Sequence, residues 1–369
     1  MRMYKRIVIK IGTKVIASPD RNLDKDIVKD LASQAAAVIN NGSEVIMVTS
    51  GAIGAGLSLL NIKKRPRDIS DLQATAAIGQ NYLMRLYGEF FKKAGYLTGQ
   101  ILLTQEDFDD RTRFLNIRHT IDRLLRHKAV PIINENDTVA TEEIRCGDND
   151  RLSSLVADLS GADKLIILTD VDGLLDEDGS VIGYVDDITP RIAKLAVKSR
   201  CDLGTGGMST KLEAARLAMR AGIECVIANG KERNVLTRML IKGDRLGTIF
   251  KSGARRFIAK KRWIAYSSKP KGALFIDKGA KDAIFKNKSL LASGIVSVEG
   301  DFVACDVIKI IDDEKKEIAR GIANYSSREL AEIKGLKTAK FKEALGREGP
   351  DEVVHKNNLV ILENHSCPN

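Results

Sequence analysis

The sequence predicts an α/β protein: a three-layer sandwich around a mostly parallel sheet, followed by a small β-rich domain. In the first part, short runs of β-branched residues alternate with helical patterns, as in right-handed βαβ units whose sheet is covered on both faces. After residue 250 the pattern changes to short strands separated by glycine and aspartate, which is typical of small barrels.

Strands and helices alternate through residues 1–250, which we expect to form one domain. The expected strands are 6–10, 44–49, 98–103, 130–134, 164–169 and 224–228, and the helices between them include 25–40, 69–93 and 151–159. Residues 251–271 are expected to be a linker. Residues 272–369 are expected to form the second domain, with strands at 274–276, 294–299, 307–311 and 317–325.

The composition is that of a globular protein with a large core, 44% hydrophobic and 29% charged over 369 residues. No apolar run approaches the roughly 18 residues of a membrane helix, so we expect a cytoplasmic protein without membrane contact. The five cysteines form no CxxC pair and the four histidines have no metal-ligand spacing. Any metal should therefore be a hard cation held by oxygen.

The formal charge of +10 is concentrated in the linker, because residues 251–271 contain eight basic residues and no acidic one. A charged linker explains this segment, and RNA binding through residues 255–262 is the minority interpretation. Sequence-independent phosphate binding needs several uncompensated cations, which the second domain does not supply. The charge pattern disfavours RNA as the main partner.

Ligands of open parallel sheets bind beyond the carboxyl ends of the strands, and polar or small residues stand at these ends here. Lys10 ends the first strand, Ser50 and Gly51 follow the second, Asn134 and Asp137 follow the fourth, and Thr169 and Asp170 end the fifth. Lys10 could be a rim lysine that extends to water, and the glycines after Ser50 could serve only a tight turn. The glycine loop alone is weak evidence, because it matches neither a P-loop nor a dinucleotide-binding motif.

A second glycine loop, at 204–211, leads directly into an amphipathic helix. Free N–H groups and the positive dipole end of such a helix favour an anion, above all a phosphate. If Lys211 and Lys10 converge, two ammonium groups would neutralise charge on one phosphoryl group, which is much of what a phosphoryl-transfer enzyme must do.

Asn149 and Asp150 directly precede a helix, so they could simply cap it. The competing interpretation is that Asn149 holds a polar substrate while Asp150 positions the lysines, with Asn134 and Asp137 as acceptors for a substrate ammonium. Acidic and amide groups beside phosphate-binding lysines indicate a zwitterionic substrate.

Six motifs in this order closely resemble those of the glutamate 5-kinases, a branch of the amino acid kinase family. They lie at residues 8–13, 48–56, 132–137, 147–150, 168–174 and 204–211. The resemblance covers essentially the whole chain, because these enzymes in bacteria commonly carry a C-terminal PUA domain. It implies the amino acid kinase fold with a PUA-like barrel, and ATP-dependent phosphorylation of the L-glutamate γ-carboxylate with Mg²⁺ in proline biosynthesis.

The resemblance also implies roles for individual residues. Lys10 and Lys211 would contact the transferring phosphoryl group, Asp150 would orient them, and Ser50, Gly51, Asn134, Asp137 and Asn149 would bind glutamate. The nucleotide would be bound by Lys10, Thr169 and Asp170 and by the loop residues Thr205, Gly206, Gly207, Met208, Ser209, Thr210 and Lys211. No metal ligand is assigned.

The resemblance further implies a homo-oligomer, a dimer or a tetramer, with feedback inhibition by proline. Residues 108–116 are a candidate regulatory segment, and an ordinary helix start explains them equally well. A separate reductase must consume the acyl phosphate, with channelling between the two enzymes as a hypothesis. A sister kinase acting on acetylglutamate, aspartate, carbamate or uridylate is the alternative, and the acceptors Asp137 and Asn149 favour free glutamate over it.

Overall fold

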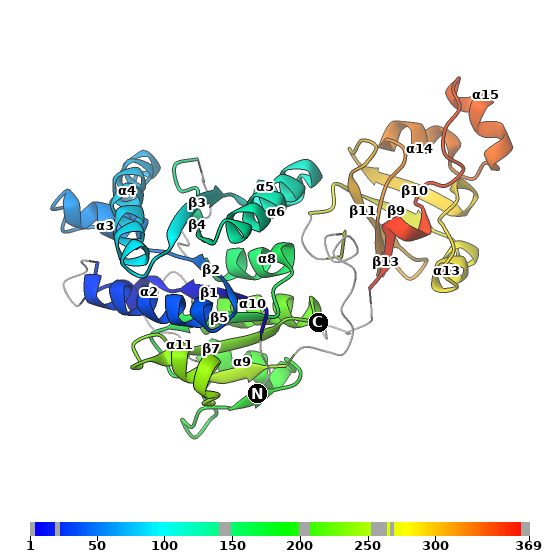
Figure 1. Cartoon of the computed structure of the whole chain (residues 1–369). Coiled ribbons are helices and arrows are strands. Elements are labelled where there is room, and N and C mark those ends of the chain that lie inside the picture. Colours follow the sequence, from blue (N-terminus) through cyan, green and yellow to red (C-terminus); the bar gives the residue numbers. More distant parts are fainter. Residues whose placement is uncertain are drawn as a thin grey trace. The chain divides into compact units, whose positions relative to one another are not determined.

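The computed structural model describes residues 4–18, 23–139, 149–198, 207–251, 264–265 and 269–362. The chain divides into two compact units, Met1–Arg256 and Phe257–Asn369, which Figure 1 shows in the colours of the sequence. The predicted domain boundaries and linker stay a prediction, because most of 251–271, including Trp263 and Arg255–Arg262, lies outside the described residues.

The first unit is built on an eight-stranded sheet in the order β3-β4-β2-β1-β5-β7-β8-β6. The strands are β1 Arg6–Ile11, β2 Glu44–Val48, β3 Leu97–Leu103, β4 Ala129–Glu135, β5 Lys164–Thr169, β6 Tyr184–Val185, β7 Glu224–Asn229 and β8 Thr248–Phe250. Every pair from β3 to β7 is parallel, and β8 runs antiparallel to β7. The prediction of a mostly parallel sheet is therefore confirmed, and the short strands β6 and β8 extend it beyond the expected set.

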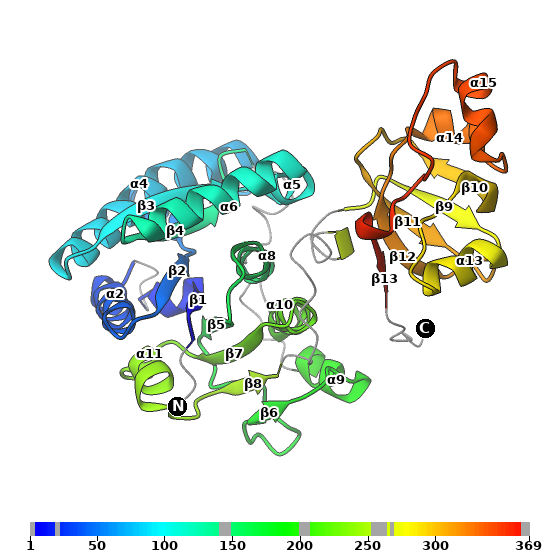
Figure 2. The ribbon, with the colours of Figure 1, turned by 45° about the vertical axis from the view of Figure 1, so that its right-hand side comes forward.

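Helices cover both faces of this sheet (Figure 2). They are α1 Thr13–Ile16, α2 Lys25–Asn40, α3 Ala52–Leu59, α4 Ile69–Lys93, α5 Gln105–Asp109, α6 Arg111–Arg126, α8 Asp150–Ser160, α9 Pro190–Lys198, α10 Met208–Arg220 and α11 Val235–Thr237, followed by the π-helical turn η1 Arg238–Lys242. Local signals explain their starts: Asp24 and Asp68 accept hydrogen bonds from the first-turn amides of α2 and α4.

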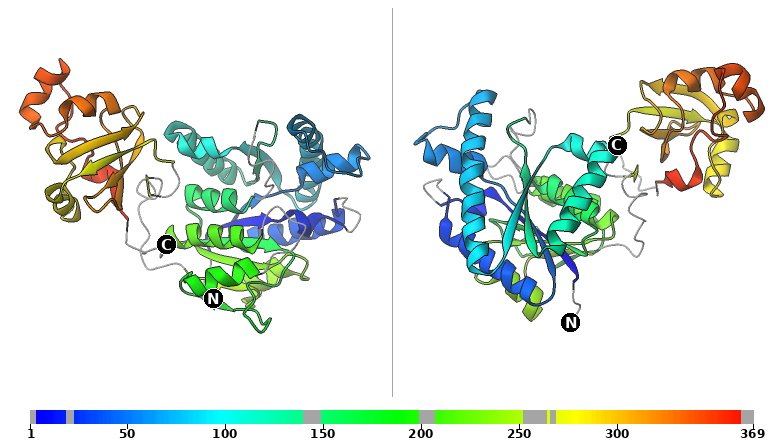
Figure 3. Two further views of the ribbon diagram at one scale, coloured as in Figure 1. Left: turned by 180° about the vertical axis from the view of Figure 1, so that it is seen from behind. Right: turned by 45° about the horizontal axis from the view of Figure 1, so that its top comes forward.

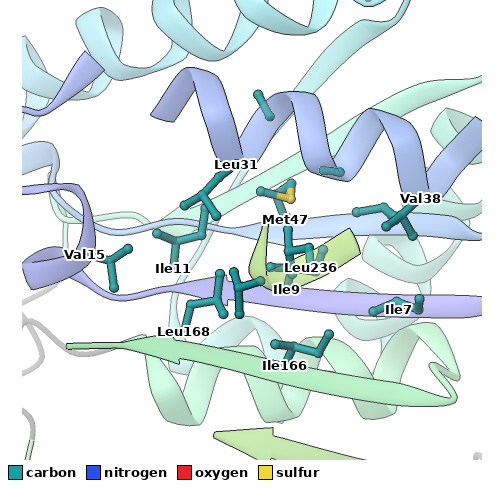
Figure 4. Packing of buried hydrophobic residues seen from close by; sticks show 14 of the residues in the cluster. Ile7, Ile9, Ile11, Val15, Leu31, Val38, Met47, Ile166, Leu168 and Leu236 are labelled. Carbon is teal, nitrogen blue, oxygen red and sulfur yellow. The ribbon is translucent and has the colours of Figure 1, made fainter. Parts of the chain in front are cut away.

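Side chains along β1 alternate between the hydrophobic core on one face of the sheet and the face that carries Lys10. Ile7, Ile9 and Ile11 enter the core with Leu31 and Val38 of α2, as Figure 4 shows. Val8 and Lys10 therefore point to the other face, where α8 packs on β1 and β5. A single strand thus supplies the centre of the core on one side and a buried lysine on the other.

Helices α3 and α4 pack unusually closely, and glycines on both helices, Gly56 and Gly79, allow it. An ideal Cβ built on Gly79 would lie 1.8 Å from the Ala52 carbonyl oxygen, a distance that no real contact reaches. The absence of a side chain at Gly79 therefore brings the backbone of α4 against the start of α3. This start directly follows Ser50 and Gly51.

The second unit has a five-stranded sheet in the order β10-β9-β11-β12-β13, with helices α13, α14 and α15 (Figure 3). Its elements are β9 Gly272–Ile276, α13 Lys278–Phe285, β10 Ile295–Gly300, β11 Val307–Ile311, β12 Glu317–Ile322, α14 Ser327–Ile333, α15 Phe341–Leu345 and β13 Leu359–Ile361. The expected strand 317–325 ends at Ile322, because Ser326 begins α14 with a capping box completed by Glu329.

We expect Gly79→Ala to lower the free energy of unfolding by about 1–3 kcal/mol, because the added methyl group forces α3 and α4 apart. Gly88→Ala is the matched control on the same helix, since its Cβ would meet only Thr98 Oγ1 at 3.7 Å. Gly88→Ala should be neutral or stabilising, as glycine-to-alanine changes usually are within helices. Urea unfolding followed by circular dichroism measures both, and equal stabilities would contradict the close packing.

Candidate active site

A buried carboxylate at the carboxyl edge of the sheet joins two lysines. Asp150 is fully buried, and its Oδ1 accepts a hydrogen bond from Lys10 Nζ at 2.6 Å. Its Oδ2 accepts from Lys211 Nζ and from Thr210 Oγ1, each at 3.0 Å. Both lysines are also buried, with exposed fractions of 2% and 7%. The carboxylate thus holds two ammonium groups close together.

Three elements far apart in the sequence supply this cluster. Lys10 comes from the end of β1, Asp150 is the first residue of α8, and Thr210 and Lys211 lie in the first turn of α10. An acidic residue in the first turn of a helix is favoured by the helix dipole, which adds to the attraction of the lysines. The three charges therefore meet where the dipoles of two helices begin.

The cluster suits phosphate chemistry. An ammonium group carries three donor hydrogens, so bonding one carboxylate oxygen does not exhaust its donor capacity. Two such groups beside the N-terminus of α10 are arranged to neutralise the negative charge of a phosphoryl group in a site shielded from water.

Hydrogen bonds join three amide side chains, beginning at Asn149, the residue before Asp150. Asn149 Nδ2 donates to the Thr49 carbonyl (2.5 Å) and to Asn134 Oδ1 (2.6 Å). Asn134 Nδ2 in turn donates to Gln80 Oε1 (2.7 Å), and the Glu135 amide N–H also donates to Asn134 Oδ1 (2.9 Å). We call Asn149, Asn134 and Gln80 the amide relay.

The amide relay tests the capping interpretation of Asn149. Within the described residues, the Asn149 side chain makes no capping hydrogen bond to α8. Both hydrogens of its Nδ2 instead go to Thr49 and Asn134, so its Oδ1 is the atom that can accept a hydrogen bond from a ligand. The capping interpretation is therefore wrong for this side chain.

The loop after β2 presents another polar atom. Ser50 is buried, and among the described residues its Oγ has no hydrogen-bond partner. Gly51 follows with φ +97°, a left-handed conformation that favours glycine, and α3 begins at the next residue. The turn therefore places a buried hydroxyl directly before a helix N-terminus.

Asp137 follows β4 and is half-buried. Burial raises the pKa of its carboxyl group to about 6, although the nearby positive charge of Arg65 acts in the opposite direction. The carboxylate is thus desolvated, which strengthens any contact that it makes with a ligand cation.

On the other side of β1, Thr169 ends β5 and Asp170 follows it. Thr169 Oγ1 donates to Asp170 Oδ1 (3.2 Å), and Lys14 Nζ lies 3.2 Å from Asp170 Oδ2. Burial acts to raise the pKa of Asp170, but the hydrogen bond and charge of Lys14, together with hydrogen bonds from Thr169 and its own backbone amide, lower it overall. Gly207, Met208 and Ser209 begin α10, whereas Thr205 and Gly206 lie outside the described residues.

The sequence that forms these elements matches a known family. Residues 5–229 match the model of the amino acid kinase family, a span that includes every residue of the site described above. The chain belongs to the amino acid kinase family. Residues 272–345 of this amino acid kinase match the PUA domain model, in agreement with the β-rich second unit. The predicted fold class is therefore confirmed.

Curated relatives cover nearly the whole chain and are named glutamate 5-kinase. The relative from Thermoanaerobacter sp. (strain X514) is 47% identical over 97% of this chain and 98% of its own length. The relatives from Syntrophotalea carbinolica and Dictyoglomus thermophilum are 44% and 41% identical, over 98% of this chain and 98% and 99% of theirs. A solved UMP kinase from Bacillus anthracis aligns with 69% of this chain and 98% of its own at 15% identity and a TM-score of 0.46. The resemblance to the glutamate 5-kinases is confirmed.

The structure of this amino acid kinase adds two residues that the sequence did not reveal. Gln80 extends the amide relay from α4, and Lys14 pairs with Asp170. Among the described residues, no helix combines the length and apolarity needed to cross a membrane, and no three His, Cys, Asp or Glu side chains form a group able to hold a metal ion.

We expect Asp150→Asn to lower the free energy of unfolding by about 3–5 kcal/mol, because it leaves two buried ammonium groups facing each other without their shared carboxylate. Asp178→Asn is the control, since Asp178 is exposed in a turn and surface changes usually stay within about 0.5 kcal/mol. Chemical denaturation of the three proteins measures both differences. A stable Asp150→Asn protein would show that the ion pairs do not contribute as described.

Proposed function

We propose that this kinase transfers the γ-phosphoryl group of ATP to the γ-carboxylate of L-glutamate, giving L-glutamyl 5-phosphate in the first step of proline biosynthesis. The observation that carries the proposal is the pair of buried lysines on Asp150, because it provides what phosphoryl transfer needs without a protein nucleophile. The near full-length similarity to glutamate 5-kinases supports the substrate.

The substrate carboxylate is itself the nucleophile at neutral pH, so no general base is required. One of its oxygens forms a bond to the γ-phosphorus while the bond from that phosphorus to the bridging oxygen breaks, and ADP leaves with the electron pair. Lys10 and Lys211 neutralise the charge on the phosphoryl oxygens, and Asp150 fixes their positions.

Around the proposed glutamate site, the hydrogen-bond acceptors and the hydrogen-bond donors come from different residues. Asp137 and the Oδ1 of Asn149 are acceptors suited to the substrate ammonium, and Asn134 holds Asn149 in place. Ser50 Oγ, buried without a partner among the described residues, and the turn at Gly51 are suited to a carboxylate oxygen. This separation supports a free amino acid, whereas acetylglutamate has no ammonium group for the acceptors.

We propose that the nucleotide lies on the β5 and α10 side of Lys10. Thr169, Asp170 and the residues Gly207, Met208, Ser209, Thr210 and Lys211 stand there, and the resemblance adds Thr205 and Gly206. Mg²⁺ would neutralise the phosphates of ATP, and its preference for phosphate oxygens, water and one or two carboxylates needs no protein cage. Both oxygens of Asp150 already bond cations, so Asp150 acts on the lysines.

The remaining parts of the proposal rest on the resemblance. They are inhibition by proline, with residues 108–116 as a candidate contact, assembly into a dimer or tetramer, a cytoplasmic location and delivery of the acyl phosphate to a reductase. Within 108–116, Phe108 is fully buried in α5 and Asp110 caps α6, so packing and capping account for these two residues.

A hydroxylamine-trapping assay tests the proposed function. With ATP and Mg²⁺, the enzyme should form hydroxamate from L-glutamate and none from N-acetylglutamate or L-aspartate, and proline should suppress the signal. Hydroxamate from acetylglutamate or aspartate alone would keep the phosphoryl chemistry but overturn the assigned substrate. Absence of any acyl phosphate would overturn the function.

Lys211→Ala should lower kcat by about 100-fold or more, the loss expected when one preorganised electrostatic group is removed from a transition state. Lys242→Ala, an exposed lysine on η1, is the matched control and should keep full activity. The readout is ADP release at saturating glutamate and ATP, with circular dichroism to verify folding. Unchanged kcat in a folded Lys211→Ala enzyme would remove Lys211 from the mechanism.

The kcat/KM for glutamate should fall as the pH drops through about 6, because the raised pKa of Asp137 means that its carboxyl becomes neutral there. A neutral carboxyl no longer attracts the substrate ammonium, which stays charged throughout this range. A profile from pH 5 to 8 at saturating ATP measures the inflection. Asp137→Asn should give a low, flat profile, and an inflection that survives in this variant would assign it to another group.

A further inference from the structure

We propose that Gln80 is a substrate-binding residue whose Nε2 donates a hydrogen bond to the α-carboxylate of the amino acid substrate. This inference rests on the proposed function and adds a specificity-determining residue to it. Gln80 lies in the middle of α4, and its side chain is 9% exposed. Among the described residues, its Nε2 is buried without a hydrogen-bond partner.

Two backbone groups, one at Asn134 and one at Asn149, fix the direction of every bond in the amide relay. The Glu135 N–H can only donate, so the Asn134 atom that it meets is Oδ1, and Asn134 Nδ2 must face Gln80. Gln80 Oε1 is therefore the acceptor, and Nε2 keeps both of its hydrogens. The Thr49 carbonyl can only accept, so Asn149 Oδ1 is the acceptor left at the opposite end.

The relay thus offers a ligand one hydrogen-bond acceptor, Asn149 Oδ1, and one donor, Gln80 Nε2. An amino acid carries the complementary pair of groups on one carbon atom: an ammonium, which donates, and a carboxylate, which accepts. A buried amide N–H without an acceptor costs free energy in the unliganded protein, and a ligand carboxylate would recover that cost as a charge-assisted hydrogen bond. The relay can therefore bind an amino acid in one orientation, with its ammonium at Asn149 and its carboxylate at Gln80.

The position of Gln80 selects the α-carboxylate over the γ-carboxylate. Asn149 is the chain neighbour of Asp150, whose lysines act on the γ-carboxylate, whereas Gln80 is separated from Asn149 by Asn134. Gly79, the residue before Gln80, brings α4 against the start of α3 beside Ser50 and Gly51. Gln80 thus belongs to the glutamate side of the site, at the end away from the lysines.

Two substitutions remove the proposed donor, one with and one without the acceptor that Gln80 offers to Asn134. Gln80→Glu keeps an acceptor for Asn134 Nδ2 but replaces the donor with a carboxylate oxygen, and Gln80→Met keeps the side-chain length and removes both functions. Each should raise the KM for glutamate by about 10- to 100-fold, the worth of one hydrogen bond to a charged group. The KM for ATP should stay unchanged. Gln34→Met, a buried glutamine on α2 bonded to Asp30 and Leu236, is the control: it should lower the melting temperature without changing either KM.

The inhibition constant of 4-aminobutyrate distinguishes the two roles of Gln80. This compound has the ammonium and the distal carboxylate of glutamate but lacks the α-carboxylate, so both Gln80 variants should bind it within about threefold of the wild type. Equal weakening of glutamate and 4-aminobutyrate would show that Gln80 acts only through Asn149. An unchanged KM for glutamate would show that the buried donor is structural; either result overturns the inference. Should Gln80→Glu fail to fold, Gln80→Met carries the test.

The wild-type enzyme in the same assay separates this inference from the function on which it rests. No ADP release with glutamate would mean that the proposed function has failed, and the inference about Gln80 fails with it. Normal ADP release together with wild-type constants in both Gln80 variants would reject the inference alone.

Discussion

The site depends on one interaction, the sharing of the buried Asp150 carboxylate between Lys10 and Lys211. Moving three charges out of water costs several kcal/mol per ion, and only good geometry and full hydrogen bonding offset that cost. Each carboxylate oxygen has its own lysine, so neither ammonium can move without breaking a buried ion pair. The interaction is thus better explained by the position it gives the lysines than by the stability it adds.

That position is possible because β1 lies at the centre of the sheet, between β2 and β5. Strands on both sides shield Lys10, and the alternation along β1 sends Ile9 and Ile11 into the core while Lys10 meets α8. The chemistry is therefore supported directly by the most buried part of the fold. A rigid core behind Lys10 is what preorganised charge stabilisation requires, because donors that must reorganise during the reaction contribute less.

The sequence was sufficient to predict the six strands from β3 to β7 and the residues that follow them, because parallel strands end at one edge of a sheet. It could not decide the role of Asn149, since an asparagine before a helix is equally suited to capping and to ligand binding. Gln80 escaped notice because a glutamine within a helix usually faces solvent. The spacing of the buried residues along α4 places Gln80 on the same face as Leu83 and Tyr87, but this spacing does not reveal that its amide meets Asn134. The short strands β6 and β8 escaped for a related reason, since two or three residues give too little alternation to detect.

The amide relay and the ion pairs of Asp150 with Lys10 and Lys211 differ in the kind of ligand group that they can distinguish. Lysines attract any anion and discriminate poorly among them, whereas amides of fixed direction distinguish a donor from an acceptor.

Tyr87, seven residues after Gln80 on the same face of α4, also reaches the end of β2, and its hydroxyl lies 3.0 Å from Thr49 Oγ1. Burial raises the pKa of Tyr87 to about 12, although its hydrogen bond with Thr49 acts in the opposite direction, so its hydroxyl stays neutral. One helix therefore fixes both the relay and the strand end from which the relay takes its direction. On the proposed function, substrate choice in this kinase accordingly depends on the packing of α4 as well as on the lysines that Asp150 holds.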